Sequence, residues 1–150
     1  MWWIVWVGVL LAAFGLGWIV VVRPFLELSA RARFDRARGL FRMRRERLEA
    51  CFVTRIGADS PAERRLWEDA TWEDAVVWAR NRSSRRLTAL IGVRFRPRPG
   101  ETRSRRATAV FEFRGGAWHA EGKRLDAIGP DEVCERIRSF ELVALPRNPV

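Results

Sequence analysis

The first 22 residues of the chain carry no charged side chain, and Arg23 and Pro24 follow them directly. At about 1.5 Å of rise per residue, a helix over this stretch is roughly 33 Å long, enough to cross a hydrocarbon core of about 30 Å. A single apolar segment in lipid must satisfy its own backbone hydrogen bonds, which a helix does. The sequence therefore predicts a transmembrane anchor over residues 1–23.

Tryptophan residues lie near both ends of the predicted span, where amphipathic indole rings favour the headgroup level. The predicted anchor residues are Trp2, Trp3, Trp6 and Trp18. A cleaved secretory signal is the alternative, but no Lys or Arg precedes the apolar run, and the A-x-A motif at residues 30–32 lies in an Arg-rich segment beyond it. We therefore expect an uncleaved signal-anchor.

Small residues fall on one face of the predicted span, at spacings of four and three: Gly8, Ala12 and Gly15. Such a stripe is typical of helix packing in membranes. It predicts association with a second copy or with another membrane protein through the span. A chance pattern is the alternative, because Gly and Ala are common in spans.

Basic residues follow the predicted span and none precedes it. Because Lys and Arg near the end of a span are retained on the cytoplasmic side, we expect a single-pass inner-membrane protein with its N-terminus outside and a cytoplasmic C-terminal domain. Anionic lipid headgroups attract such residues by about 1 kcal/mol each. The predicted lipid contacts are Arg23, Arg31, Arg33, Arg36, Arg38, Arg42 and Arg44.

Residues 24–56 are predicted to form a basic amphipathic juxtamembrane helix. Phe34, Phe41, Leu48 and Phe52 fall on one stripe at helical spacing, and most of the Arg side chains lie off it. This stripe would either lie in the membrane interface or pack on the domain that follows or on a second copy. Both alternatives stay open at this point.

A second helix is predicted to begin near residue 60. Ser60 suits the N-cap, Pro61 suits the first helical position, and Glu63 completes a capping box. We expect this helix to continue to about Arg82, either unbroken or restarted at Thr71. Its acidic residues are interpreted as a solvated face with intrahelical ion pairs, and they are Glu68, Asp69, Glu73 and Asp74.

The hydrophobic period changes to two after residue 84. Half-buried strands are predicted over residues 87–95 and 106–114, and Gly115-Gly116 makes a tight turn into a third strand. A last helix opens near Pro130.

The predicted fold class is α+β. An N-terminal transmembrane helix and the juxtamembrane helix precede helical segments packed on a three-stranded antiparallel meander with a C-terminal helix. Residues 57–145 would form the small domain, and residues 146–150 a tail. The element order is similar to that of cystatin-like and NTF2-like rolls, and no motif identifies a family.

The net charge of +10 is concentrated in residues 80–106, which carry ten Arg against one acid. Nucleic acid, bound through its phosphates, is therefore an alternative partner to lipid. The predicted anion face comprises Arg86, Arg94, Arg96, Arg98, Arg105 and Arg106.

Motifs that carry catalysis are absent: the sequence contains no P-loop, GxGxxG, HExxH, CxxC or GxSxG. His119 is the only histidine, which excludes a histidine-based metal cluster within one chain. Cys51 and Cys134 are interpreted as buried, inert thiols, with a Cys134–His119 pair as the alternative. We expect no catalytic residues, metal or cofactor.

Three functions follow from these features. The first is a non-enzymatic binding or scaffold module held at the membrane, and the second is a tethered nucleic-acid binder. The third is a ligand-binding or enzymatic roll with a pocket near Trp78 and Trp118.

Overall fold

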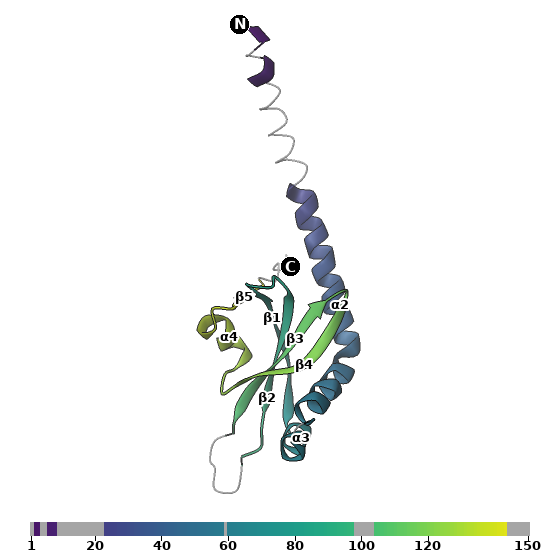
Figure 1. The fold of residues 1–150 in the computed structure, drawn as a ribbon, viewed down its shortest axis with the longest axis vertical. Helices are drawn as coiled ribbons and strands as arrows, with labels where there is room; N and C mark the ends of the chain where they lie inside the picture. Colours follow the sequence, from purple (N-terminus) through teal and green to yellow (C-terminus); the bar gives the residue numbers. More distant parts are fainter. Residues whose placement is uncertain (1, 4–5, 9–22, 59, 98–103, 144–150) are drawn as a thin grey trace, which may run out of the picture. The chain divides into compact units, whose positions relative to one another are not determined.

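The computed structural model describes residues 2–3, 6–8, 23–58, 60–97 and 104–143 (Figure 1). The chain falls into two compact units, Met1–Gly39 and Leu40–Val150, and each is described by itself.

The first unit contains short helical stretches at residues 2–3 and 6–8 and the beginning of helix α2 (Arg23–Ile56). Trp2, Trp3 and Trp6 are exposed. Among the described residues, no helix combines the length and the apolar character needed to cross a membrane. This finding contradicts the predicted transmembrane anchor and the single-pass inner-membrane location derived from it. Residues 1, 4–5 and 9–22 of that prediction lie outside the described residues.

The second unit is built on a five-stranded antiparallel sheet with the strand order β4-β3-β2-β1-β5. After α2 the elements are α3 (Pro61–Glu68), β1 (Thr71–Asn81), β2 (Leu87–Arg94), β3 (Arg106–Arg114), β4 (Ala117–Asp126), α4 (Pro130–Arg136) and β5 (Phe140–Leu142). The α+β class agrees with the prediction. The predicted three-stranded meander is wrong, because β1 and β5 extend it to five strands.

Strand β1 replaces the second half of the helix predicted up to Arg82. Helix α3 ends at Glu68, and Trp72 and Trp78 both contact aromatic rings of α2 from one face of β1. Between the pairs Trp72↔Val93 and Val76↔Ile91, β1 advances four residues while β2 advances two. This bulge interrupts the period of two, so the sequence does not show the alternation that marks a strand.

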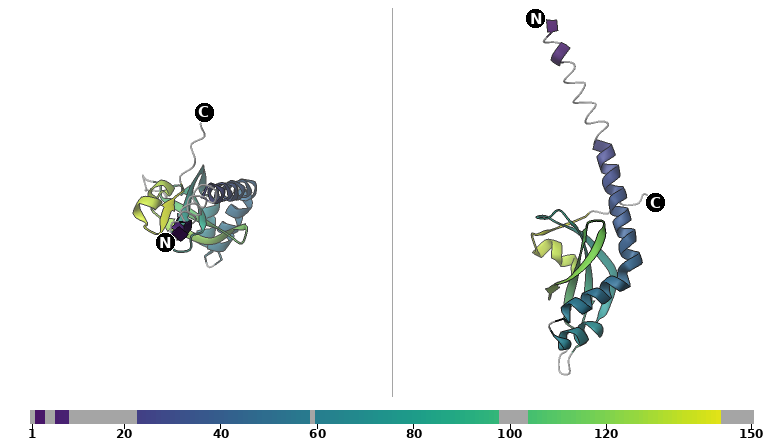
Figure 2. Two further views of the ribbon diagram at one scale, coloured as in Figure 1. Left: turned by 90° about the horizontal axis from the view of Figure 1, so that it is seen from above. Right: turned by 45° about the vertical axis from the view of Figure 1, so that its right-hand side comes forward.

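A second irregularity lies in β4, between the pairs Ala109↔Arg124 and Phe111↔Ala120. Gly122, in this stretch, has φ +75°, and a Cβ there would lie 3.3 Å from Cβ of Arg55 on α2. Bulges bend a strand and increase its twist. The two irregularities accompany the strong curl of the sheet in Figure 2.

The part of α2 within the second unit packs its apolar stripe on one face of this sheet. Phe41 is fully buried, with its ring centroid 5.6 Å from Trp78, 5.5 Å from Phe111 and 4.9 Å from Trp118. For residues 40–56, the stripe therefore packs on the domain. The Phe41 ring occupies the region near Trp78 and Trp118 for which a pocket was predicted.

Helix α4 covers the opposite face of the sheet (Figure 1). Its Val133 forms a buried cluster with Ala79, Leu90 and Val110 of the sheet and with Phe140 of β5. The prediction that residues 87–95 form a half-buried strand is wrong for this reason, since β2 is buried on both faces.

Two local predictions are confirmed. The backbone N–H of Glu63 donates to Oγ of the N-cap Ser60 at 3.3 Å, and Pro61 occupies the first turn of α3. Gly115 and Gly116 have φ angles of +58° and +79° and form the two-residue turn between β3 and β4. Positive φ at both turn residues matches the twist of the flanking strands.

Candidate functional site

A cavity of about 710 Å³ in the second unit lies between α3 and neighbouring ends of β2, β3 and β4. Small-molecule sites typically have volumes of about 300–1,000 Å³. We call it the α3 cavity. It is lined by Glu63, Leu66, Trp67, Phe95, Ser104, Arg105, Arg106, Arg124, Asp126 and Ala127.

The cationic groups of the α3 cavity differ in how they are paired. Arg124 is held by Glu63 at 2.8 Å and by Asp126 at 3.4 Å, whereas Arg105 and Arg106 make no ion pair with any described residue. The hydrogen bond with Glu63 is the main cause of the raised pKa of Arg124, so this side chain stays charged. With three Arg against two acids, the described residues of the lining carry a net charge of +1.

The apolar wall of the α3 cavity consists of Leu66, Trp67, Phe95 and Ala127. Trp67 and Phe95 meet edge to face, with ring centroids 4.9 Å apart, and both are buried. The wall is anchored because Trp67 also contacts Phe52 of α2 at 5.1 Å. The cavity therefore combines a packed apolar wall with two guanidinium groups that form no ion pair with a described residue.

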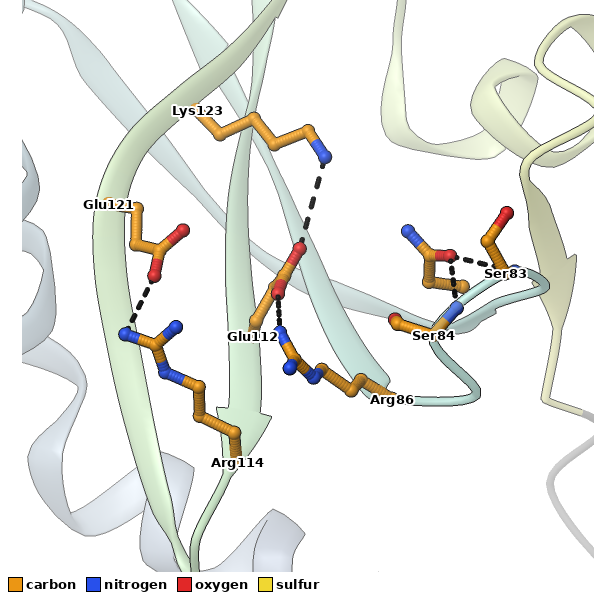
Figure 3. Close-up of polar contacts among 8 residues, drawn as sticks. Ser83, Ser84, Arg86, Glu112, Arg114, Glu121 and Lys123 are labelled. Carbon is orange, nitrogen blue, oxygen red and sulfur yellow. Dashed lines mark hydrogen bonds and ion pairs between the residues drawn. The ribbon is translucent and has the colours of Figure 1, made fainter.

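The predicted anion face of six Arg is divided by the structure. Arg86 pairs with Glu112 at 3.4 Å, and Glu112 also lies 3.8 Å from Lys123 (Figure 3). Arg94 pairs with Glu73 at 2.7 Å. These carboxylates reduce the positive charge that the two Arg offer to a ligand.

The remaining members of the predicted face lie toward the α3 end of the sheet. Arg96, Arg105 and Arg106 are exposed, and Arg98 lies outside the described residues. Arg106 is the register partner of Arg94. Of the five that the structure describes, Arg105 and Arg106 line the α3 cavity and the other three do not.

The predicted lipid-contact residues are distributed over both units. In the first unit, Arg23 begins α2, Arg38 is partly buried, and the exposed members are Arg31, Arg33 and Arg36. In the second unit, Arg42 and Arg44 are exposed. Of the predicted packing seam, Gly8 is helical, and Ala12, Gly15 and the anchor residue Trp18 lie outside the described residues.

The acidic residues predicted to share one helix face occupy different elements. Glu68 in α3 pairs with Arg64 at 2.9 Å, as expected for an intrahelical pair. Glu73 and Asp74 instead lie in the β1 bulge. Within the described ranges, no group of three or more His, Cys, Asp or Glu side chains is placed to hold a metal ion.

The two cysteines lie in different environments. Cys51 is exposed, so the interpretation of a buried thiol is wrong for this residue. Cys134 is partly buried in the α4 cluster, and burial raises the pKa of its thiol. The structure brings His119 into one cavity with Cys51, whereas the sequence suggested Cys134 as its alternative partner.

The sequence interpretation did not identify Trp67, Phe95 and Arg124 as members of one site. Trp67 lies in α3, Phe95 directly follows β2, and Arg124 lies in β4. Only the sheet register and the packing of α3 bring the three residues together. The signal nearest to this site in the sequence was the capping box, since it placed Glu63 at the start of α3.

Comparison with protein-family models, with curated proteins and with solved structures gave no match for this chain.

Proposed function

We propose that the second unit is a non-enzymatic binding domain whose ligand site is the α3 cavity. The observation that carries this proposal is a cavity of about 710 Å³ in which two guanidinium groups, on Arg105 and Arg106, lie with an apolar wall and form no ion pair with a described residue. A lining charge of +1 favours a ligand with one negative charge and an apolar, planar body.

The charge arrangement supports a small anion better than a nucleic acid. Arg86 and Arg94 are engaged by Glu112 and Glu73, which leaves a shorter basic surface than the sequence suggested. Nucleic-acid binding by the full set of six Arg stays a prediction.

A pair of fluorescent probes tests the proposal on the full chain. 8-Anilinonaphthalene-1-sulfonate carries one negative charge, and N-phenyl-1-naphthylamine is its neutral counterpart. Hydrogen bonds to charged groups contribute about 1.5–3 kcal/mol, and 1.4 kcal/mol corresponds to tenfold in affinity. We therefore expect Arg105→Gln/Arg106→Gln to weaken sulfonate binding about tenfold or more and to leave binding of the neutral probe unchanged.

Two further variants separate occupancy of the cavity from general basic charge. Leu66→Trp places a larger side chain in the cavity wall and is expected to weaken the binding of both probes. Arg86→Gln removes an exposed Arg outside the lining and is expected to leave the binding of both probes unchanged. Equal sulfonate binding by the wild type and Arg105→Gln/Arg106→Gln, or an equal loss with Arg86→Gln, would overturn the proposal.

A further inference from the structure

A second cavity lies between α2 and the outermost strand β4 and has a volume of about 320 Å³. We call it the α2–β4 groove. Its polar residues on α2 are spaced by three, four and four positions, which places Arg44, Arg47, Cys51 and Arg55 on one helix face. The full lining is Arg44, Arg47, Leu48, Cys51, Arg55, Trp118, His119 and Ala120.

The α2–β4 groove is strongly cationic. It has three guanidinium groups and no carboxylate in its lining, and none of these three Arg forms an ion pair within the described part of the chain. Two acids of the same elements are engaged by other cations, since Glu49 pairs with Arg45 at 2.7 Å and Glu121 with Arg114 at 2.8 Å. The second of these pairs is drawn in Figure 3.

The groove also contains a nucleophile. Cys51 is exposed and has Arg47 and Arg55 one helical turn away on either side, with the His119 imidazole in the same lining. A cleft of one charge sign concentrates ligands of the opposite sign and accelerates their association. A reagent that carries negative charge on both sides of a reactive bond would match this arrangement.

We propose that the α2–β4 groove binds anionic disulfides, of the glutathione disulfide class, and directs them to the Cys51 thiol. In the reaction, the Cys51 sulfur gives up its proton and attacks one sulfur of the disulfide. A new sulfur–sulfur bond forms, the original one breaks, and one thiol leaves and takes up a proton. Cys51 is oxidised to a mixed disulfide and the leaving half is reduced to a thiol, so no other oxidant is needed.

The test compares two disulfides of opposite charge on the full chain. Glutathione disulfide is anionic at neutral pH and cystamine is cationic, and peptide mass spectrometry measures mixed-disulfide formation at Cys51 and Cys134 separately. We expect Cys51 to react faster than the partly buried Cys134 with glutathione disulfide. We use the ratio of the glutathione disulfide rate to the cystamine rate at Cys51. Because the same thiol reacts in both cases, its intrinsic reactivity cancels in this ratio, and the effect of the disulfide's charge remains.

Charge variants then test the role of the groove. Electrostatic steering changes association rates by about 10–1,000-fold, so we expect Arg47→Gln/Arg55→Gln to lower the rate ratio at Cys51 about tenfold. Arg47→Lys/Arg55→Lys keeps the charge and should restore most of the ratio. The control Arg42→Gln/Arg64→Gln removes two exposed Arg outside the groove and should leave it near the wild-type value. A ratio unchanged by Arg47→Gln/Arg55→Gln, or lowered equally by the control, would overturn the proposal.

Discussion

The guanidinium group of Arg45 on α2 donates a hydrogen bond of 2.9 Å to the backbone carbonyl oxygen of Asp74 in β1. It donates a second hydrogen bond to the carbonyl oxygen of Glu73 and a third to the Glu49 side chain. Both carbonyls belong to the β1 bulge, where the pairing with β2 is interrupted. Arg45 therefore supplies donors to backbone groups that the sheet leaves without their regular partners.

Replacing Arg45 should destabilise the domain. Arg45→Met keeps much of the apolar stem but removes the donors to Glu73 and Asp74, and lost hydrogen bonds to charged groups cost about 1.5–3 kcal/mol. Urea unfolding followed by circular dichroism measures the change in the free energy of unfolding. Arg42→Met, at an exposed position of the same helix, should change it by less than about 0.5 kcal/mol. Equal effects of the two substitutions would contradict this role for Arg45.

Gly92 accommodates the Glu73 side chain. A Cβ at position 92 would overlap the Glu73 carboxylate and would lie 3.2 Å from Cδ of Pro130. Because the Glu73 carboxylate would have to move and give up its 2.7 Å ion pair with Arg94, we expect Gly92→Ala to lower the free energy of unfolding by about 1 kcal/mol. In a double-mutant cycle, Glu73→Ala should relieve part of this cost, so that the double variant is more stable than the sum of the two single effects predicts. Strictly additive effects would contradict the overlap.

Phe41 and Met43 provide a matched pair on α2. Phe41 is fully buried against three aromatic rings, and Met43 is 77% exposed. Truncation of a buried Phe costs about 3–5 kcal/mol, so Phe41→Ala should lower the midpoint of thermal unfolding strongly. Met43→Ala should leave the midpoint nearly unchanged. Similar midpoints for both variants would show that the stripe of α2 does not pack on the sheet.

Cys134 should make stability depend on pH in the alkaline range. Burial raises the pKa of its thiol above the ordinary value of 9.0, so the folded chain holds this proton to higher pH than the unfolded chain does. The resulting stabilisation is present below the unfolded pKa and is lost as pH rises through the folded pKa. We expect the difference in free energy of unfolding between the wild type and Cys134→Ala to be smaller at pH 10 than at pH 7. A difference that stays constant or grows would contradict the raised pKa.

The amino-acid sequence by itself determined the local features that depend on neighbouring residues. The N-cap at Ser60 and the Gly115-Gly116 turn were predictable because each is defined by residues close together in the chain. The apolar stripe of α2 was visible for the same reason, since helical spacing alone places Phe41, Leu48 and Phe52 on one face.

Only the tertiary structure decided which of these local features lie together. Residues 71–81 have an apolar pattern compatible with a helix, and their pairing with β2 and β5 makes them a strand. The long apolar N-terminal run suggested a membrane span, yet no helix of the described residues could form one. The α3 cavity and the α2–β4 groove are each lined by residues that are far apart in the chain. Which Arg side chains pair with carboxylates also depends on strand register, as Arg86 with Glu112 and Arg94 with Glu73 show. Long-range packing of this kind has no counterpart in the spacing of residues along a single sequence.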